Sequence, residues 1–404
     1  MHGFQLDALV LGGLLVGGAL ISGITHRSFL SLTALYVLAG IVLGGSGLKV
    51  LDLSTHDAFV EDLAIVALVL ILFRDGLEVE SEMLQREWRV PLRKLVLAMP
   101  ITAAIIAVAA HAIIGLDWLE AFLLGALLSP TDPVLSSSVV TNPLVPRRVR
   151  HSLNLESGLN DGLALAPVVA LSAALSPGRG DFLWWRFILE DVSIGLGAGV
   201  AIGLLAAQLL PRERDPLEVI PAHQRSLFAL GTAFATYGAL AYGGHGNAFL
   251  AVFVCAITLG IRRPDLRRHV HEGTEEITEI VKLGVFVVFG SVLSLHGLFE
   301  HGAGSVAMLA IALLVARPVA IWLSLIGVRP PLDRQTQAFI AWFGPKGVAT
   351  MTYSLFVLGE HVQSAREITN IAGLVVVGST LAHGLTDAPG AQWMGRHARR
   401  SDVS

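Results

Sequence analysis

The stretch from 119 to 140 reads LEAFLLGALLSPTDPVLSSSVV, an apolar segment interrupted about halfway by two prolines and an acid. Pro130 and Pro133 flank Thr131 and Asp132. Each proline removes a backbone donor and disrupts the preceding turn, so the pair predicts an unwound segment. In lipid the freed carbonyls must find partners within the protein. Secondary transporters often build a cation site from an unwound turn beside a carboxylate; a proline kink with a satisfied aspartate is the simpler alternative.

The composition indicates that this segment lies in a membrane. Hydrophobic residues make up 53% of the chain and charged residues 15%, with a mean hydropathy of +0.67, whereas soluble domains carry about 25% charge. A net charge of -4 without a basic domain gives no indication of nucleic-acid binding. The single cysteine, Cys255, excludes an intrachain disulfide. The first apolar run lacks a basic leader, so we expect a retained span and no signal peptide.

Apolar runs recur along the whole chain. A spanning helix needs about 20 mainly apolar residues. Short connections and the absence of a long polar stretch predict one all-α membrane domain over 1–404. The thirteen candidate spans are 6–24, 29–45, 62–74, 94–114, 119–140, 152–176, 188–210, 226–243, 247–261, 277–297, 304–326, 335–358 and 367–385.

The distribution of Lys and Arg predicts the orientation of these spans. With the N-terminus outside, 21 of them fall on the inner side, Arg74 and Lys94 included, and 4 fall outside. The other three, Lys282, Arg317 and Lys346, lie inside spans or at their edges. One miscounted helix would reverse the sides of all loops after it, so the observed distribution supports thirteen spans. We therefore expect a multi-pass protein of the plasma membrane with its C-terminus in the cytoplasm.

Charged residues within spans are costly and usually functional. The sixth span contains LNLESGLNDGLALAPVVAL, in which Glu156 and Asn160 share one helical face. Ser157 and Asp161, also four apart, share the adjacent face. Oxygen ligands of this kind suit a hard cation. Capping near the inner end is an alternative for Glu156 and Ser157, but it does not explain the deeper Asp161.

Two later spans complete the set of intramembrane charges. Arg317 precedes Pro318 in the eleventh span, and the twelfth is broken by Gly344-Pro345-Lys346-Gly347. At about 1.5 Å per residue, Arg317 and Glu156 come within a few Å of one depth, so we predict that they pair. Lys346 is placed to offset the carbonyl ends of the broken helices. For Lys282, three residues after Glu279, we expect a snorkelling side chain.

The two broken spans, the fifth and the twelfth, cross the membrane in opposite directions. Spans 4–6 and 11–13 therefore look like inverted repeats with a broken helix in each, an architecture that places a substrate site at the bilayer midplane.

These motifs resemble those of the monovalent cation/proton antiporters of the NhaP branch, and the resemblance covers essentially the whole chain. It is carried by Pro130 to Pro133, by Glu156-Ser157-x-x-Asn160-Asp161, by the Arg317 span and by Gly344 to Gly347, with Phe73-x-x-Gly76-Leu77 as a weaker signal. It implies the fold with crossed broken helices. It also implies a homodimer in which a core (94–176 and 304–385) moves against scaffold spans (6–74 and 188–297).

The resemblance also implies roles for individual residues. Asp161 resembles the obligatory carboxylate that holds the cation or protons, and Asp132 its partner. Ser157 and the Thr131 main chain resemble further ligands, and Glu156 contributes, in some cases through water. Asn160 implies electroneutral exchange, and Arg317 resembles the arginine that pairs with the glutamate. Lys346 departs from the family, where many members carry arginine.

The expected function is exchange of Na⁺ or Li⁺ for H⁺ without a cofactor, with membrane lipid as a further partner. Burial disfavours an ionised carboxylate and a bound cation favours it, so a proton and a cation would compete for Asp161. A K⁺/H⁺ antiporter is the first alternative, since cavity size helps decide among these ions, and a cation channel is the second.

An enzyme is a third alternative, which we do not favour. The segment His269-Val270-His271-Glu272 superficially suggests metal ligands, but it lacks the HExxH spacing and is expected in an inner loop. His151, His223, His269 and His271 are expected on the inner side, where histidines can tune a pH response or be incidental.

Overall fold

The computed structural model describes residues 9, 12–14, 16–18, 20, 32–51, 53, 57–83, 92–132, 139, 141–176, 182–211, 221–328 and 333–401. In this part every regular element is helical, which confirms the all-α prediction. Most of the first expected span lies outside the described residues, as do Pro133 and the side chain of Ser157.

The helices follow the predicted spans in order. α2 is Leu32–Leu43, α3 Ala58–Met83, α6 Trp118–Leu127, α8 Arg147–Leu175, α10 Ser193–Leu209, α11 Ala222–Gly243, α12 Ala248–Arg262, α13 Pro264–Val292, α14 Leu295–Leu298, α17 Arg334–Trp342, α18 Val348–Gly359 and α19 Ala365–Ser401. Three spans contain a π-helical turn: η1 (Lys94–Ala98), α5 (Met99–Ala109) and η2 (Ala110–Ile114); α9 (Trp184–Arg186) and η4 (Phe187–Val192) before α10; and α15 (Ala303–Ile311), η5 (Ala312–Ala316) and α16 (Arg317–Leu325).

Five helical stretches of the described chain are long and apolar enough to cross a membrane. They are Lys94–Ile114, Val149–Leu175, Trp184–Leu209, Ala303–Leu325 and Ala365–His397. Shorter apolar helices include α6 and α18, the pieces expected from the two broken spans. α3 and α13 are long enough but carry too many charged residues to qualify. The count of thirteen spans stays a prediction.

Several boundaries differ from the predictions because charged residues were read as span ends. α3 continues past 74 to Met83, so Arg74 lies within a helix and not in an inner loop. α13 begins at Pro264, which makes the expected loop at 269–272 helical. α19 runs on to Ser401, so the expected tail after 385 is also helix. Helices can continue beyond the bilayer through polar residues, and a search for apolar runs does not detect these helix ends.

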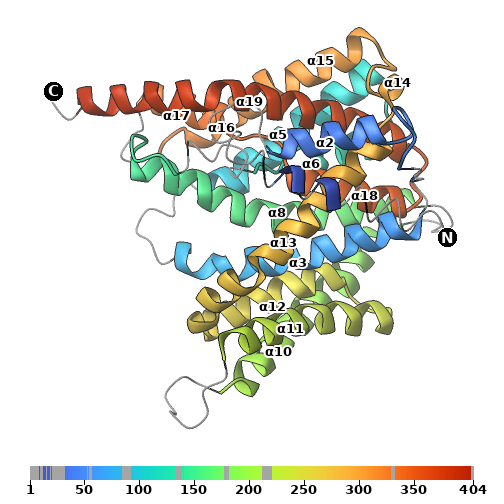
Figure 1. Ribbon diagram of the computed structural model, residues 1–404, viewed down its shortest axis with the longest axis vertical. Helices are drawn as coiled ribbons and strands as arrows, with labels where there is room; N and C mark the ends of the chain where they lie inside the picture. Colours follow the sequence, from blue (N-terminus) through green and yellow to red (C-terminus); the bar gives the residue numbers. More distant parts are fainter. Residues whose placement is uncertain are drawn as a thin grey trace.

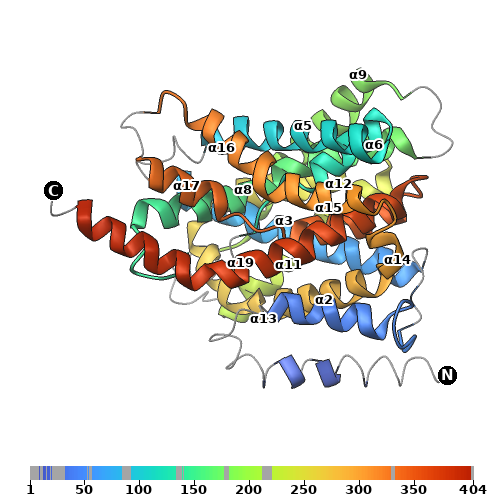
Figure 2. The same ribbon diagram turned by 90° about the horizontal axis from the view of Figure 1, so that it is seen from above.

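The helices group into two parts joined by a shared middle. Figure 1 shows α10, α11 and α12 at one end of the long axis and α15 and α19 at the other, with α3, α13 and α8 between them. From above, α8 and α3 run through the middle, between α5 and α6 on one side and α2 and α13 on the other (Figure 2). α3 contacts α8, α12, α13 and α18.

Small residues bring α10 and α12 together. A Cβ at Gly199 would lie 2.6 Å from the carbonyl oxygen of Ala251, and one at Gly203 would lie 2.7 Å from that of Cys255. Such contacts leave room for no side chain, and close approach over small residues is how helices associate in lipid. These helices therefore form a closely packed pair.

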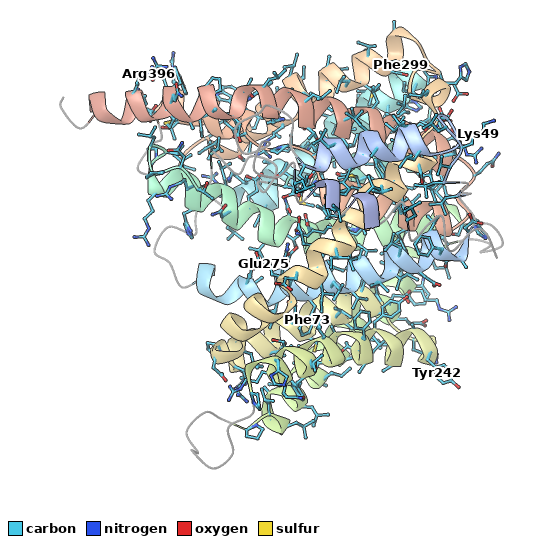
Figure 3. All side chains as sticks on the ribbon, viewed as in Figure 1. Lys49, Phe73, Tyr242, Glu275, Phe299 and Arg396 are labelled. Carbon is cyan, nitrogen blue, oxygen red and sulfur yellow. The ribbon has the colours of Figure 1, made fainter. Side chains whose placement is uncertain are left out.

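The sides of the bundle agree with the predicted alternation at four positions. Lys49, Tyr242 and Phe299 lie toward one end of the helices, and Arg396 lies at the opposite end (Figure 3). With the N-terminus outside, the order of the thirteen predicted spans places the first three on the outer side and Arg396 on the inner side. Which side faces the cytoplasm stays a prediction.

Candidate functional site

The two predicted helix breaks contact each other at the centre of the protein. α6 ends at Leu127 and α17 at Trp342, and the residues after each helix, 128–132 and 343–347, are not helical. The backbone N–H of Asp132 donates to the Pro345 carbonyl at 2.8 Å, and the Thr350 hydroxyl donates to the Leu127 carbonyl at 2.8 Å. Each break thus provides partners for backbone groups that the other has freed, which lipid would leave unsatisfied.

Lys346 lies at one of the freed helix ends, where the sequence placed it. Its side chain is fully buried, and its Nζ lies 3.4 Å from the Ser129 carbonyl and 3.3 Å from the Pro130 carbonyl. These carbonyls follow the end of α6, where the helix dipole is negative. The Lys346 backbone N–H in turn donates to the Ser379 hydroxyl at 3.0 Å, which links the break to α19.

Asp132 occupies the complementary position. Its Oδ2 accepts from the backbone N–H of Val348 at 3.4 Å, at the first residue of α18. A helix N-terminus favours a negative group. Each break therefore contributes a charged side chain to a helix end beside the other break. Lys346 lies at the C-terminal end of α6, and Asp132 lies at the N-terminal end of α18.

Glu156 is held by two buried cations. Arg317 binds it with both nitrogens, Nη1 to Oε1 at 2.7 Å and Nη2 to Oε2 at 3.2 Å, which confirms the predicted pair. Lys94 Nζ lies 2.6 Å from Oε2, an interaction the sequence analysis missed because Lys94 was assigned to an inner loop. The Lys94 side chain is fully buried, and the Glu156 side chain is 8% exposed. Both carboxylate oxygens are thus engaged in the strong, two-pronged geometry that arginine favours.

Asn160 and Thr131 join α8 to the first break. The Asn160 Nδ2 donates to the Thr131 carbonyl at 2.8 Å and contacts its hydroxyl at 3.1 Å. The Thr131 hydroxyl lies 3.4 Å from Glu156 Oε1. The predicted residues on α8 and at the 130–133 break are therefore neighbours.

Asp161 differs from every other acid at this centre. It is buried, and among the described residues its Oδ1 has no hydrogen-bond partner. The fully buried Tyr353 on α18 donates to the Asp161 main-chain carbonyl at 2.7 Å, a contact that holds the backbone and leaves the carboxylate free of it. Tyr353 lies in the predicted twelfth span, but nothing in its spacing singled it out.

Four further charged residues act on this carboxylate. They are Arg74 and Asp75 on α3, Lys282 on α13 and Asp132 in the first break. Arg74 Nη2 lies 2.8 Å from Asp75 Oδ1, and Asp75 is 3% exposed. The sequence holds a signal for this pair that carried no prediction: two adjacent charges at the edge of an apolar run.

The expectation that Lys282 snorkels is wrong. Its residue is 7% exposed, and its Nζ lies 4.0 Å from a carboxylate oxygen of Glu279, whose side chain is 54% exposed. The side chain is buried because it faces the protein, where Arg74, Asp75 and Asp132 act on its charge.

Comparison with known proteins gives the family. The model of the sodium/hydrogen exchanger transmembrane family matches residues 14–393. The K(+)/H(+) antiporter NhaP of Alkalimonas amylolytica is 27% identical over 401 residues, 98% of this chain and 68% of that protein. The K(+)/H(+) antiporter NhaP2 of Shewanella sp. (strain ANA-3) is 26% identical over 363 residues, 89% of this chain and 62% of that protein. The chain thus spans about two thirds of these relatives' length.

The solved structure of the sodium proton antiporter MjNhaP1 from Methanocaldococcus jannaschii at pH 8 has the same fold. It superimposes with a TM-score of 0.78 over 97% of this chain and 100% of that one, at 19% sequence identity. The family match over residues 14–393 shows that the chain belongs to the sodium/hydrogen exchanger family.

Proposed function

We propose that this protein exchanges a monovalent cation for a proton, with Asp161 as the group that binds each in turn. The supporting observation is the buried Asp161 Oδ1, which has no partner among the described residues. An ionised carboxylate in this position is so costly that it takes up a proton or a cation. Because one carboxylate cannot hold both well, competition combined with alternating exposure produces exchange.

The further ligands come from the contacting breaks. Asp132 brings a second carboxylate, and the Thr131 carbonyl retains a lone pair beside its bond to Asn160. Ser157 lies on the same face of α8 as Asp161 and is proposed as a ligand from this spacing. Glu156 has both oxygens engaged by Arg317 and Lys94, so we assign it a contribution through water.

The proposed stoichiometry is one cation for one proton. It is supported by Asn160, which brings no charge and whose amide holds the Thr131 backbone. Asp161 is then the single residue on this turn of α8 that changes charge during the cycle. Exchange would be electroneutral and insensitive to the membrane potential.

Na⁺ or Li⁺ is the proposed cation, and K⁺ is the alternative that the names of the NhaP and NhaP2 relatives favour. We further propose a homodimer in the plasma membrane with the C-terminus inside and lipid contacts around it. Residues 94–176 and 304–385 would move as a core against the scaffold. No enzymatic activity and no cofactor are expected.

The test is proton movement in proteoliposomes with a trapped pH dye and a clamped potential. Na⁺, Li⁺, K⁺ and choline are added in turn to wild type, Asp161→Asn and Asp333→Asn. We expect Na⁺ or Li⁺ to dissipate the gradient in wild type and in the Asp333→Asn control, and not in Asp161→Asn. A response to K⁺ alone would keep the mechanism and assign K⁺ as the substrate. Wild-type rates in Asp161→Asn would refute the proposal.

A further inference from the structure

His383 is a buried histidine whose two ring nitrogens both face carbonyl oxygens. It lies on α19 and is 2% exposed. Its Nε2 is 2.8 Å from the carbonyl oxygen of Trp342, the last residue of α17. Its Nδ1 is 2.7 Å from the carbonyl oxygen of Ser379. A carbonyl oxygen accepts hydrogen bonds and never donates them.

A neutral imidazole can donate to only one of these two carbonyls. It carries one N–H, so one nitrogen would direct its lone pair at a carbonyl lone pair less than 3 Å away. Turning the ring over would replace the nitrogens by C–H groups, whose contacts to oxygen are about 3.3–3.6 Å and do not fit the observed spacing. The doubly protonated imidazolium donates to both carbonyls.

We propose that His383 is a second proton-binding site, separate from Asp161, and that its protonated ring joins α19 to the end of α17 and supports the helix break that carries Lys346. The link to the break is Ser379. Its hydroxyl accepts from the Lys346 backbone N–H at 3.0 Å and lies 3.3 Å from His383 Nδ1.

Two features beside the ring favour its protonated form. The Trp342 carbonyl belongs to the C-terminal turn of α17, where helix carbonyls lack internal partners and the dipole is negative. The Trp342 indole stacks on the imidazole with centroids 5.1 Å apart and planes at 21°. An aromatic face attracts a cation at this range. The indole is itself fixed, since its Nε1–H donates to Thr386 at 2.9 Å.

Burial of the ring and two nearby cations oppose its charge and keep the proton exchangeable. Arg317 on α16 and Lys346 in the break act on the ring with like charge. Both have other partners, Arg317 the Glu156 carboxylate and Lys346 the Ser129 and Pro130 carbonyls. Asp387 lies one turn further along α19 and is 9% exposed. Protonation of His383 is thus balanced between the two carbonyl acceptors, which favour it, and burial and the two cations, which oppose it, and it depends on pH.

Loss of the proton changes the break. The Ser379 hydroxyl then turns to donate to the bare Nδ1, and Nε2–H keeps the Trp342 carbonyl. The Ser379 carbonyl, at 2.7 Å, is left facing a lone pair, so the ring and the turn of α19 move apart. Because Ser379 also holds the Lys346 backbone, we expect cation binding at the adjacent site to weaken as His383 is deprotonated.

The direct test is NMR of protein labelled with ¹⁵N-histidine, recorded from acidic to alkaline pH. The His383 signals are identified by their loss in His383→Gln and, should that variant fail to fold, by through-space correlation with the stacked Trp342 indole of the wild type. We expect both ring nitrogens protonated at the acidic end and one of them titrating. A single neutral tautomer throughout would overturn the proposal, and this readout does not depend on transport.

A second arm measures the apparent affinity for Na⁺ across pH in proteoliposomes, and it rests on the proposed function. The glutamine side chain of the His383→Gln variant can donate to one carbonyl but does not titrate. The affinity of this variant should be about tenfold weaker than wild type at acidic pH, the loss of one hydrogen bond from a charged donor, and should converge with wild type at alkaline pH. His245→Gln, at an exposed turn, is the control and should follow wild type. An unchanged pH profile in His383→Gln would contradict the proposal.

Discussion

Glu156 and Asp161 lie five residues apart on α8, and their surroundings are opposite. Glu156 is bound on both oxygens by Arg317 and Lys94, whereas Asp161 has a buried oxygen without a partner in the described structure. A carboxylate fixed by two cations stabilises the fold and has little capacity for a moving ion. A carboxylate without a fixed counter-charge must take one from its substrates. The difference therefore distinguishes a structural residue, Glu156, from the proposed ion-binding residue, Asp161.

The largest expected effect distinguishes these two carboxylates by activity and stability together. Asp161→Asn should abolish exchange and leave the protein at least as stable as wild type, because it removes an unpaired buried charge. Purified protein is compared by thermal unfolding and by the proteoliposome assay. A variant that lost activity only because it unfolded would remove the distinction.

Glu156→Gln should have the converse effect. It leaves Lys94 and Arg317 buried without their carboxylate, and breaking a buried pair in this way costs about 3–5 kcal/mol. The free energy of unfolding should fall accordingly, with loss of folded protein. The matched control is Glu276→Gln on α13, at an exposed position. A change within about 0.5 kcal/mol is expected there. Equal stability of the two variants would contradict the assigned role of Glu156.

Gly344→Ala tests whether Arg317 needs the space at the second break. A Cβ there would lie 2.1 Å from the Arg317 guanidinium carbon. Overpacking of this kind costs about 1–3 kcal/mol, and the arginine must move away from Glu156. We expect lower thermal stability and weaker cation affinity. Gly231→Ala, with no atom within 4 Å of the added Cβ, should be tolerated. Similar behaviour of the two alanines would show that Arg317 has free space.

The sequence predicted most of this centre because its signals are local. The two prolines around Asp132 indicate an unwound segment. The four-residue spacing on α8 indicates a shared helical face, and the lysine at the second break indicates a position beside the helix ends. Lys94 and the Arg74–Asp75 pair were missed because a charge at the edge of an apolar run is read as its end. His383 was not distinguished because its significance depends on Trp342, a partner 41 residues away.

The smallest effect is expected at the start of α17, outside the spans. Asp333 caps this helix, accepting from the backbone N–H groups of Gln335 and Thr336. Burial acts to raise its pKa, but hydrogen bonds from Thr336 and the interaction with His397 outweigh this and leave the pKa lowered. A lowered folded-state pKa means that the contribution to stability is present above the unfolded-state pKa and is lost as pH falls through the folded-state value.

Asp333→Ala should therefore destabilise the protein by about 0.5–2 kcal/mol at neutral pH, and by less in acid. Thermal unfolding at both pH values measures this, and Asp333→Asn, which retains a capping side chain, should lose less. A loss for Asp333→Ala that is independent of pH would exclude the carboxylate as the cause.

The central claim is that a cation and a proton compete for Asp161. It is tested most directly by adding Na⁺ to lightly buffered, purified protein and measuring the protons released and the cations bound together, in wild type and in Asp161→Asn. We expect close to one proton released per Na⁺ bound in wild type and no coupled release in the variant. Na⁺ binding without proton release in wild type, or equal release in Asp161→Asn, would contradict it.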